Sequence, residues 1–194
     1  MKKVFYVCSY GGCGSKMLCN ALKKYGIIEH VHSRKPPSEL KYVGGKKTYC
    51  EWFNDINVPE DEIKNFYVIY IYKNPVKSIL SRYQTQTVLK HVQLEDKTVT
   101  IDDLIREKKD LFKIKEFYDN YTKPNKRNYK IICVKYEDIF EKQDELSRIL
   151  GIGSLNLVKK ETKREFDENK LKVLNEIYKP LLEEMSNNDF IFIS

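Results

Sequence analysis

The chain has 194 residues and lacks any long apolar segment, internal repeat or low-complexity tract. A membrane-spanning helix needs roughly 20 consecutive apolar residues, and no run in this sequence approaches that length. Hydrophobic residues nevertheless make up 41% of the chain and aromatic residues 12%. That much apolar surface excludes a disordered chain, so we expect one compact domain over residues 1–194 with no membrane partner.

The five cysteines lack the spacing of a structural framework, because their number is odd and no CxxC pair is present. This argues against both a disulfide scaffold and a zinc site, and favours buried free thiols. A signal peptide is also missing, since three glycines interrupt the apolar run VFYV soon after it begins. We therefore expect a cytoplasmic protein.

The net charge of +7, with a pI near 9.0, favours anionic ligands through the long-range field of the protein. The lysines are scattered along the chain rather than gathered in one stripe. Scattered lysines are typical of a solvated surface, so we expect no nucleic-acid partner.

Four short segments rich in β-branched and aromatic residues alternate with stretches that have helical spacing. We predict strands at residues 3–9, 27–32, 66–72 and 130–136, and helices at 15–26, 75–83, 101–121, 140–151 and 168–185. The terminal FIFI is either an edge strand or a packed tail. This order predicts an α/β fold in three layers, with a central parallel sheet of about four or five strands flanked by helices.

The segment CSYGGCGSKML follows the first predicted strand and leads into a predicted helix that Ser15 caps. Glycines let successive backbone amides turn toward an anion, and a helix N-terminus adds its own N–H groups. The phosphate-binding loop of Mg-dependent kinases and GTPases places a hydroxyl residue after its lysine, but Met17 follows Lys16 here. The loop therefore predicts a phosphate site of another kind, with a P-loop kinase as an alternative and a purely structural turn as another.

A second group of polar residues follows the third predicted strand. Lys73 ends this strand, Ser81 lies eight positions later, and Arg82 is next to it. Two cations and a hydroxyl group in this arrangement predict a second anion site near the first. Asn74 and Pro75 provide the N-cap and the first residue of the intervening helix.

The two groups together resemble the sulfotransferases that use 3′-phosphoadenosine-5′-phosphosulfate (PAPS). GGCGSK corresponds to the 5′-phosphosulfate loop of that family, and KNPVKSILS to its 3′-phosphate element; IICVKYEDIFEKQDELSRILGI and EIYKPLLEEM continue the match in the same order. The resemblance implies a P-loop-like fold that binds PAPS and releases adenosine 3′,5′-bisphosphate, with no metal ion. The implied donor-binding residues are Gly11, Gly12, Cys13, Gly14, Ser15, Lys16, Met17, Lys73, Ser81 and Arg82.

Sulfuryl transfer needs charge stabilisation at the leaving phosphate and removal of a proton from the acceptor. The resemblance places the usual loop cation at Gly12, so Lys16 is our candidate for the first task. His30 and His32, and less directly Glu29, follow the second predicted strand and are candidates for the base. Strand alternation puts the two histidines on one face.

The irregular segment 33–61 is a candidate substrate loop, although a surface insertion is an equal alternative. We expect a sulfotransferase that acts on a hydroxyl or amine of a small-molecule or saccharide acceptor. Because Gly12 replaces a cation, a catalytically impaired nucleotide-binding protein with the same fold is the alternative.

Overall fold

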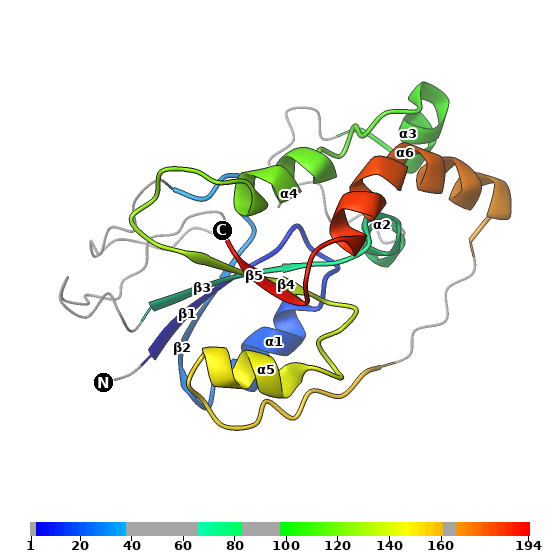
Figure 1. The fold of residues 1–194 in the computed structure, drawn as a ribbon. Helices are drawn as coiled ribbons and strands as arrows, with labels where there is room; N and C mark the ends of the chain where they lie inside the picture. Colours follow the sequence, from blue (N-terminus) through cyan, green and yellow to red (C-terminus); the bar gives the residue numbers. More distant parts are fainter. Residues whose placement is uncertain (1–2, 38–65, 83–97, 161–165) are drawn as a thin grey trace.

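The computed structural model describes residues 3–37, 66–82, 98–160 and 166–194, and these form an α/β fold around a five-stranded sheet (Figure 1). The spatial order of the strands is β2-β1-β3-β4-β5. Their bounds are β1 Lys3–Cys8, β2 Gly26–Val31, β3 Phe66–Tyr72, β4 Ile131–Lys135 and β5 Ile191–Ile193. The first four strands are parallel, and β5 pairs antiparallel with β4 at the edge. The predicted fold class is therefore confirmed, and FIFI forms an edge strand.

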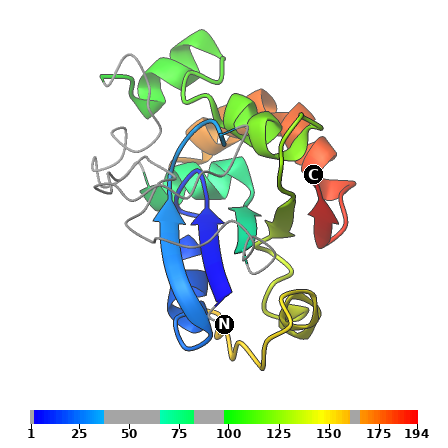
Figure 2. The ribbon, with the colours of Figure 1, turned by 90° about the vertical axis from the view of Figure 1, so that its left-hand side faces the viewer.

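Helices cover both faces of the sheet. Their bounds are α1 Ser15–Leu22, α2 Pro75–Arg82, α3 Ile101–Glu107, α4 Ile114–Thr122, α5 Gln143–Ile149 and α6 Glu168–Ser186. One hydrophobic cluster joins one face of the sheet to α1 and α5, and a second joins the other face to α2, α3, α4 and α6. Figures 1 and 2 show the sheet between these two helical layers.

The sequence of β3 shows why two different cores form. Side chains alternate along a strand, so Tyr70 and Tyr72 point to one face while Ile69 and Ile71 point to the other. Tyr70 stacks on Tyr121 of α4 with ring centroids 4.5 Å apart. The face under α4 and α6 is therefore aromatic, and the face under α1 and α5 is aliphatic.

The largest error among the predicted boundaries concerns residues 101–121. The long helix expected over 101–121 is two helices, because Lys108 and Lys113 adopt positive φ angles of 52° and 56°. The side chain of Asp110 holds the intervening turn by accepting hydrogen bonds from Lys115 N at 2.8 Å and from the Tyr178 hydroxyl at 2.6 Å. Tertiary contacts thus overrode helical spacing that continued through the break.

Both ends of α1 differ from the prediction, in which Ser15 was the N-cap and the helix stopped at Gly26. Gly14, with φ of 78°, is the N-cap, and Ser15 is the first helical residue. The helix ends at Leu22, and Gly26 begins β2, where an added Cβ would lie 2.2 Å from Lys3 O. The close approach of two parallel strands, rather than a helix stop, therefore requires this glycine.

Among the residues that the structure describes, no helix is long and apolar enough to cross a membrane. Residues 33–37 of the predicted substrate loop lie against α4 and the segment after it, since the Tyr121 hydroxyl donates to Ser33 O at 2.7 Å and Asn120 Nδ2 donates to Arg34 O at 3.1 Å. The remainder of that prediction, residues 38–61, lies outside the described residues.

Candidate functional site

The carboxyl ends of the parallel strands carry the residues that the sequence singled out. The turn after β1 contains three glycines with positive φ angles: Gly11 at 114°, Gly12 at 68° and Gly14 at 78°. No side chain caps the N-terminus of α1. The first-turn amides of α1 and the positive end of its dipole therefore face the glycine turn, as in protein sites that bind phosphate and sulfate.

A cavity of about 480 Å³ opens beside this turn, between α1, β2 and the end of α2. Its lining residues are Gly12, Gly14, Ser15, Lys16, Cys19, Asn20, Lys23, Ile28, His30, His32 and Arg82. Three of these side chains are permanently cationic, and none is acidic in the part of the chain that the structure describes. The cavity is therefore suited to an anion.

Two serines and two histidines form a chain of polar contacts along the wall of the cavity. Ser9 Oγ donates to Ser15 Oγ at 2.9 Å, and His30 Nε2 lies 2.8 Å from the same Ser15 oxygen. His32 Nδ1 lies 2.8 Å from Ser9 O and 3.4 Å from Ser9 Oγ. These contacts hold the Ser15 hydroxyl at the N-terminus of α1, where it does not act as an N-cap. They also hold both imidazole rings in place.

The contact between His32 and Ser9 determines which ring nitrogen of His32 carries a proton. A backbone carbonyl oxygen only accepts hydrogen bonds, so Nδ1 of His32 is the donor. Nε2 is then the basic nitrogen of the neutral ring, which is the arrangement that orients histidine for proton transfer. The rings of His30 and His32 have centroids 4.4 Å apart, so the prediction that they share a face is confirmed.

Glu29, the third candidate base, is 6% exposed and alternates to the opposite side of β2 from His30. It is absent from the described lining of the cavity. The geometry therefore favours the histidines over Glu29 as groups that could take a proton there.

Arg82 reaches the glycine turn from the last turn of α2. A Cβ added at Gly11 would lie 2.7 Å from Arg82 Nε, so the guanidinium occupies the space that a side chain at position 11 would need. Lys16 approaches the same cavity from the first turn of α1. Two cations from different helices thus lie at the glycine turn.

Gly12 faces the body of α2. A Cβ at this position would lie 3.0 Å from Ser78 O and 3.2 Å from Ser81 Cβ, and the φ angle of 68° disfavours any side chain. A side chain at position 12 would therefore strain this backbone. The turn packs on α2 through Gly12, and the charge comes from Arg82 and Lys16.

Lys73 and Ser81 lie near the turn but are absent from the described lining of the cavity. Lys73 Nζ lies 4.6 Å from the centroid of the Tyr136 ring, and an added Cβ at Gly14 would be 2.4 Å from Tyr136 Cε2. Tyr136 thus lies beside both Lys73 and the glycine turn. Of the second predicted anion site, only Arg82 lines the cavity.

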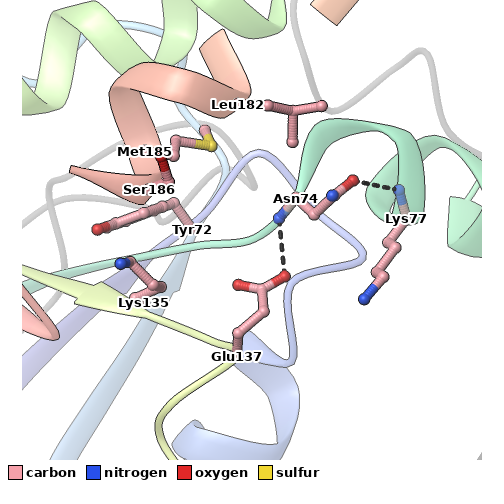
Figure 3. A pocket seen from close by; sticks show the side chains of 8 residues that line it. All are labelled: Tyr72, Asn74, Lys77, Lys135, Glu137, Leu182, Met185 and Ser186. Atoms are coloured by element: carbon pink, nitrogen blue, oxygen red, sulfur yellow. Dashed lines mark hydrogen bonds between the residues drawn. The ribbon is translucent and has the colours of Figure 1, made fainter. Parts of the chain in front are cut away.

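The junction between β3 and α2 is held by two polar contacts. Asn74 Oδ1 accepts a hydrogen bond from Lys77 N at 3.0 Å, which confirms Asn74 as the N-cap of α2. Asn74 N donates to Glu137 Oε1 at 3.0 Å (Figure 3). Glu137 therefore joins the end of β4 to the end of β3 and fixes the backbone next to Lys73.

Cys13 and Met17 anchor the turn without lining the described cavity. Cys13 Sγ donates to Gly11 O at 3.1 Å and lies 3.5 Å from Ser78 Oγ. Burial raises the pKa of the Cys13 thiol, which keeps it neutral and unreactive. Met17 packs against the core under α1 and α5.

Sequence reasoning missed Asn20 and Lys23, which also line the cavity. Asn20 lies on α1 and Lys23 is its C-cap, four and seven residues beyond Lys16, and side chains at this spacing share one helix face. The spacing was visible in the sequence, but only the position of β2 beside α1 makes this face a cavity wall.

Comparisons with protein-family models, with curated proteins and with solved structures returned no match to this chain.

Proposed function

We propose that the chain is a cytoplasmic sulfotransferase that moves a sulfuryl group from PAPS to a hydroxyl or amine of a small-molecule or saccharide acceptor. One observation carries the proposal: a glycine turn, a helix N-terminus, three cations and two histidines line one cavity with no acidic side chain in its described part. The resemblance of GGCGSK and KNPVKSILS to the motifs of PAPS-dependent sulfotransferases supports the choice of donor.

The residues of the cavity fit the phosphosulfate end of the donor. The first-turn amides of α1 and the Ser15 hydroxyl offer hydrogen bonds, and Lys16 and Arg82 offer positive charge. The donor supplies an activated sulfuryl group together with a leaving phosphate. In this assignment Arg82 takes the part that a loop cation plays in the family, since position 12 is a glycine at which a side chain would be strained.

The proposed chemistry rests on positioning and charge. Lys16 and Arg82 stabilise the negative charge that grows on the leaving phosphate. Nε2 of His32 takes the proton of the acceptor, while the Ser9 carbonyl holds Nδ1 of the same ring. His30 orients and polarises the Ser15 hydroxyl toward the anion. A role for Lys73 and Ser81 at the 3′-phosphate remains a prediction of the resemblance.

Calorimetric titration with adenosine 3′,5′-bisphosphate tests the donor assignment. We expect binding without magnesium, and a loss of at least about tenfold in affinity in Arg82→Ala because a charge-assisted hydrogen bond is removed. Arg148→Ala, an exposed arginine on α5, is the matched control and should bind as the native protein does. Absence of binding, together with binding of ATP and magnesium, would instead support a P-loop kinase.

A second candidate function is nucleotide binding without turnover, which the missing cation at Gly12 favours. A sulfate-transfer assay from PAPS to a panel of phenols and saccharides separates the two. The enzyme proposal expects transfer that His32→Asn reduces by about 10²–10⁴-fold while nucleotide affinity is kept. Tight nucleotide binding with no transfer to any acceptor in the panel would favour the non-catalytic protein.

A further inference from the structure

The Ser15 hydroxyl, at the N-terminus of α1, lies at the end of a series of hydrogen bonds whose direction is fixed. The carbonyl oxygen of Ser9 accepts the Nδ1 proton of His32 at 2.8 Å, so this nitrogen cannot itself accept a hydrogen bond. The Ser9 hydroxyl lies 3.4 Å from the same nitrogen and therefore donates to Ser15 Oγ, at 2.9 Å. Ser9 is fully buried, so bulk solvent does not compete for its hydrogen. Ser15 therefore always receives one hydrogen bond from Ser9.

The second partner of Ser15 is His30, whose Nε2 lies 2.8 Å from Ser15 Oγ. A serine hydroxyl has one hydrogen to donate and two lone pairs. If Nε2 carries no proton, Ser15 donates to it and has no hydrogen left for an anion. If Nε2 carries a proton, His30 donates, Ser15 accepts from both neighbours, and its own hydrogen is free for an anion at the glycine turn. The proton on one nitrogen therefore decides whether Ser15 donates to an anion.

The charges around His30 couple that proton to the anion. The titratable and charged side chains that share the described lining of the cavity with His30 are Lys16, Cys19, Lys23, His32 and Arg82. Glu29 alternates to the opposite side of β2, so no carboxylate in the described lining offsets these cations. Without a bound anion, their charge disfavours an imidazolium ion at position 30, and a bound anion reverses that balance.

We propose that His30 is a positioning residue that couples anion binding to proton uptake: a proton from solvent on its Nε2 turns the Ser15 hydroxyl from a donor to His30 into a donor to the anion. The inference rests on the anion site of the proposed function, but not on PAPS as the donor or on sulfuryl transfer. His32 has a separate part, because its Nδ1 is held by the Ser9 carbonyl and only its Nε2 can take a proton.

Nitrogen NMR of histidine-labelled protein tests the coupling, with inorganic sulfate as the probe. Sulfate is a dianion from about pH 5 to about pH 8, the range in which histidine titrates, so a pH effect belongs to the protein. The spectrum of His30→Gln assigns the His30 signals. At pH 7 we expect sulfate to raise the protonated fraction of His30 Nε2, while chloride at equal ionic strength does not. Nδ1 of His32 should stay protonated throughout.

The pH dependence of sulfate affinity gives the sign of the effect. Because the protonated form binds, the affinity of the native protein should fall by about tenfold or more as the pH rises across this range. His30→Gln keeps an amide donor that does not titrate, so it should remove most of the pH dependence without abolishing binding. Ser15→Ala should weaken binding at low pH most. Ser186→Ala, an exposed serine at the end of α6, is the matched control and should behave as the native protein does.

Two results would each overturn the proposal: a sulfate titration that leaves the protonation of His30 Nε2 unchanged, or a pH dependence in His30→Gln equal to that of the native protein. Titrating adenosine 3′,5′-bisphosphate in the same samples tests the proposed function separately. Sulfate coupling at His30 without bisphosphate binding would support the positioning role and count against a PAPS-dependent enzyme. Bisphosphate binding without any coupling at His30 would overturn the positioning role alone.

Discussion

The aromatic core under α4 and α6 and the glycine turn at the start of α1 are built in opposite ways. In the core, rings from β3 and α4 fill the space, and Phe117 stacks on Tyr121 at 5.2 Å between centroids. In the turn, three glycines leave space that Arg82, Tyr136 and the backbone of α2 occupy. Large side chains therefore supply stability in the core, whereas missing side chains let cations and amides meet at the turn.

The largest expected effect is a loss of stability when the aromatic core is disrupted. Phe117 is fully buried, so Phe117→Ala leaves a cavity and should lower the free energy of unfolding by about 3–5 kcal/mol. Urea denaturation measures the change. Under native conditions the remaining folded protein should still bind adenosine 3′,5′-bisphosphate with unchanged affinity; a parallel loss of affinity would show that the core and the turn are one unit.

The next largest effect is expected from a side chain added to the glycine turn. Gly12→Lys introduces the cation that the resemblance to sulfotransferase loops places at this position, but at a φ of 68° and 3.0 Å from Ser78 O. We expect the free energy of unfolding to fall by about 1–3 kcal/mol, because a side chain is forced into the left-handed region. Nucleotide affinity should not increase. Tighter binding by Gly12→Lys would contradict our account of why Arg82 supplies the charge.

A smaller effect comes from pH. Burial raises the pKa of Cys133 in the aromatic core from its ordinary value of 9.0 to about 12. The unfolded chain releases this proton first, so the stabilisation is complete below pH 9.0 and is lost as the pH rises from there toward the folded pKa. The expected slope is about 1.4 kcal/mol per pH unit above pH 9. Denaturation at several alkaline pH values should show a shallower slope in Cys133→Ala than in the native protein.

The smallest effect concerns the surface between α4 and α6. Burial acts to raise the pKa of Glu184, but the hydrogen bond from Lys123 and the charge of Lys115 outweigh it and lower the pKa. The stabilisation is therefore present above the unfolded carboxyl pKa and is lost as the pH falls through the folded pKa. We expect less than about 1 kcal/mol, since the group is partly exposed. Glu184→Gln should remove this acid dependence, and salt should weaken it in the native protein.

Local chemistry was sufficient for several elements. The prediction for β3 was correct to the residue, because FYVIYIY combines β-branched and aromatic residues without interruption. Asn74 caps α2 as expected. The break between α3 and α4 was not predictable from spacing, because the hydrogen bonds of Asp110 that hold the turn come partly from Tyr178 of α6, far along the chain.

The candidate site shows the same division. The glycine turn, Lys16 and the shared face of the two histidines followed from the sequence, since each depends on strand or helix periodicity nearby. The position of Arg82 over Gly11, and of Tyr136 between Lys73 and Gly14, depends on how α2 and β4 pack on the turn. Periodicity says nothing about such contacts.

The sequence by itself determined the α/β class and the glycine turn at the start of α1, because alternating apolar strands and glycines constrain the backbone locally. Only the tertiary structure shows which cations reach the glycine turn and why a side chain at position 12 would be strained. Strand order brings α2 against the turn, and the carbonyl oxygen of Ser78 lies only 3.0 Å from where a side chain at position 12 would begin. The charge at the turn therefore comes from Lys16 and from Arg82, which lies beside Gly11 although α2 is far along the chain.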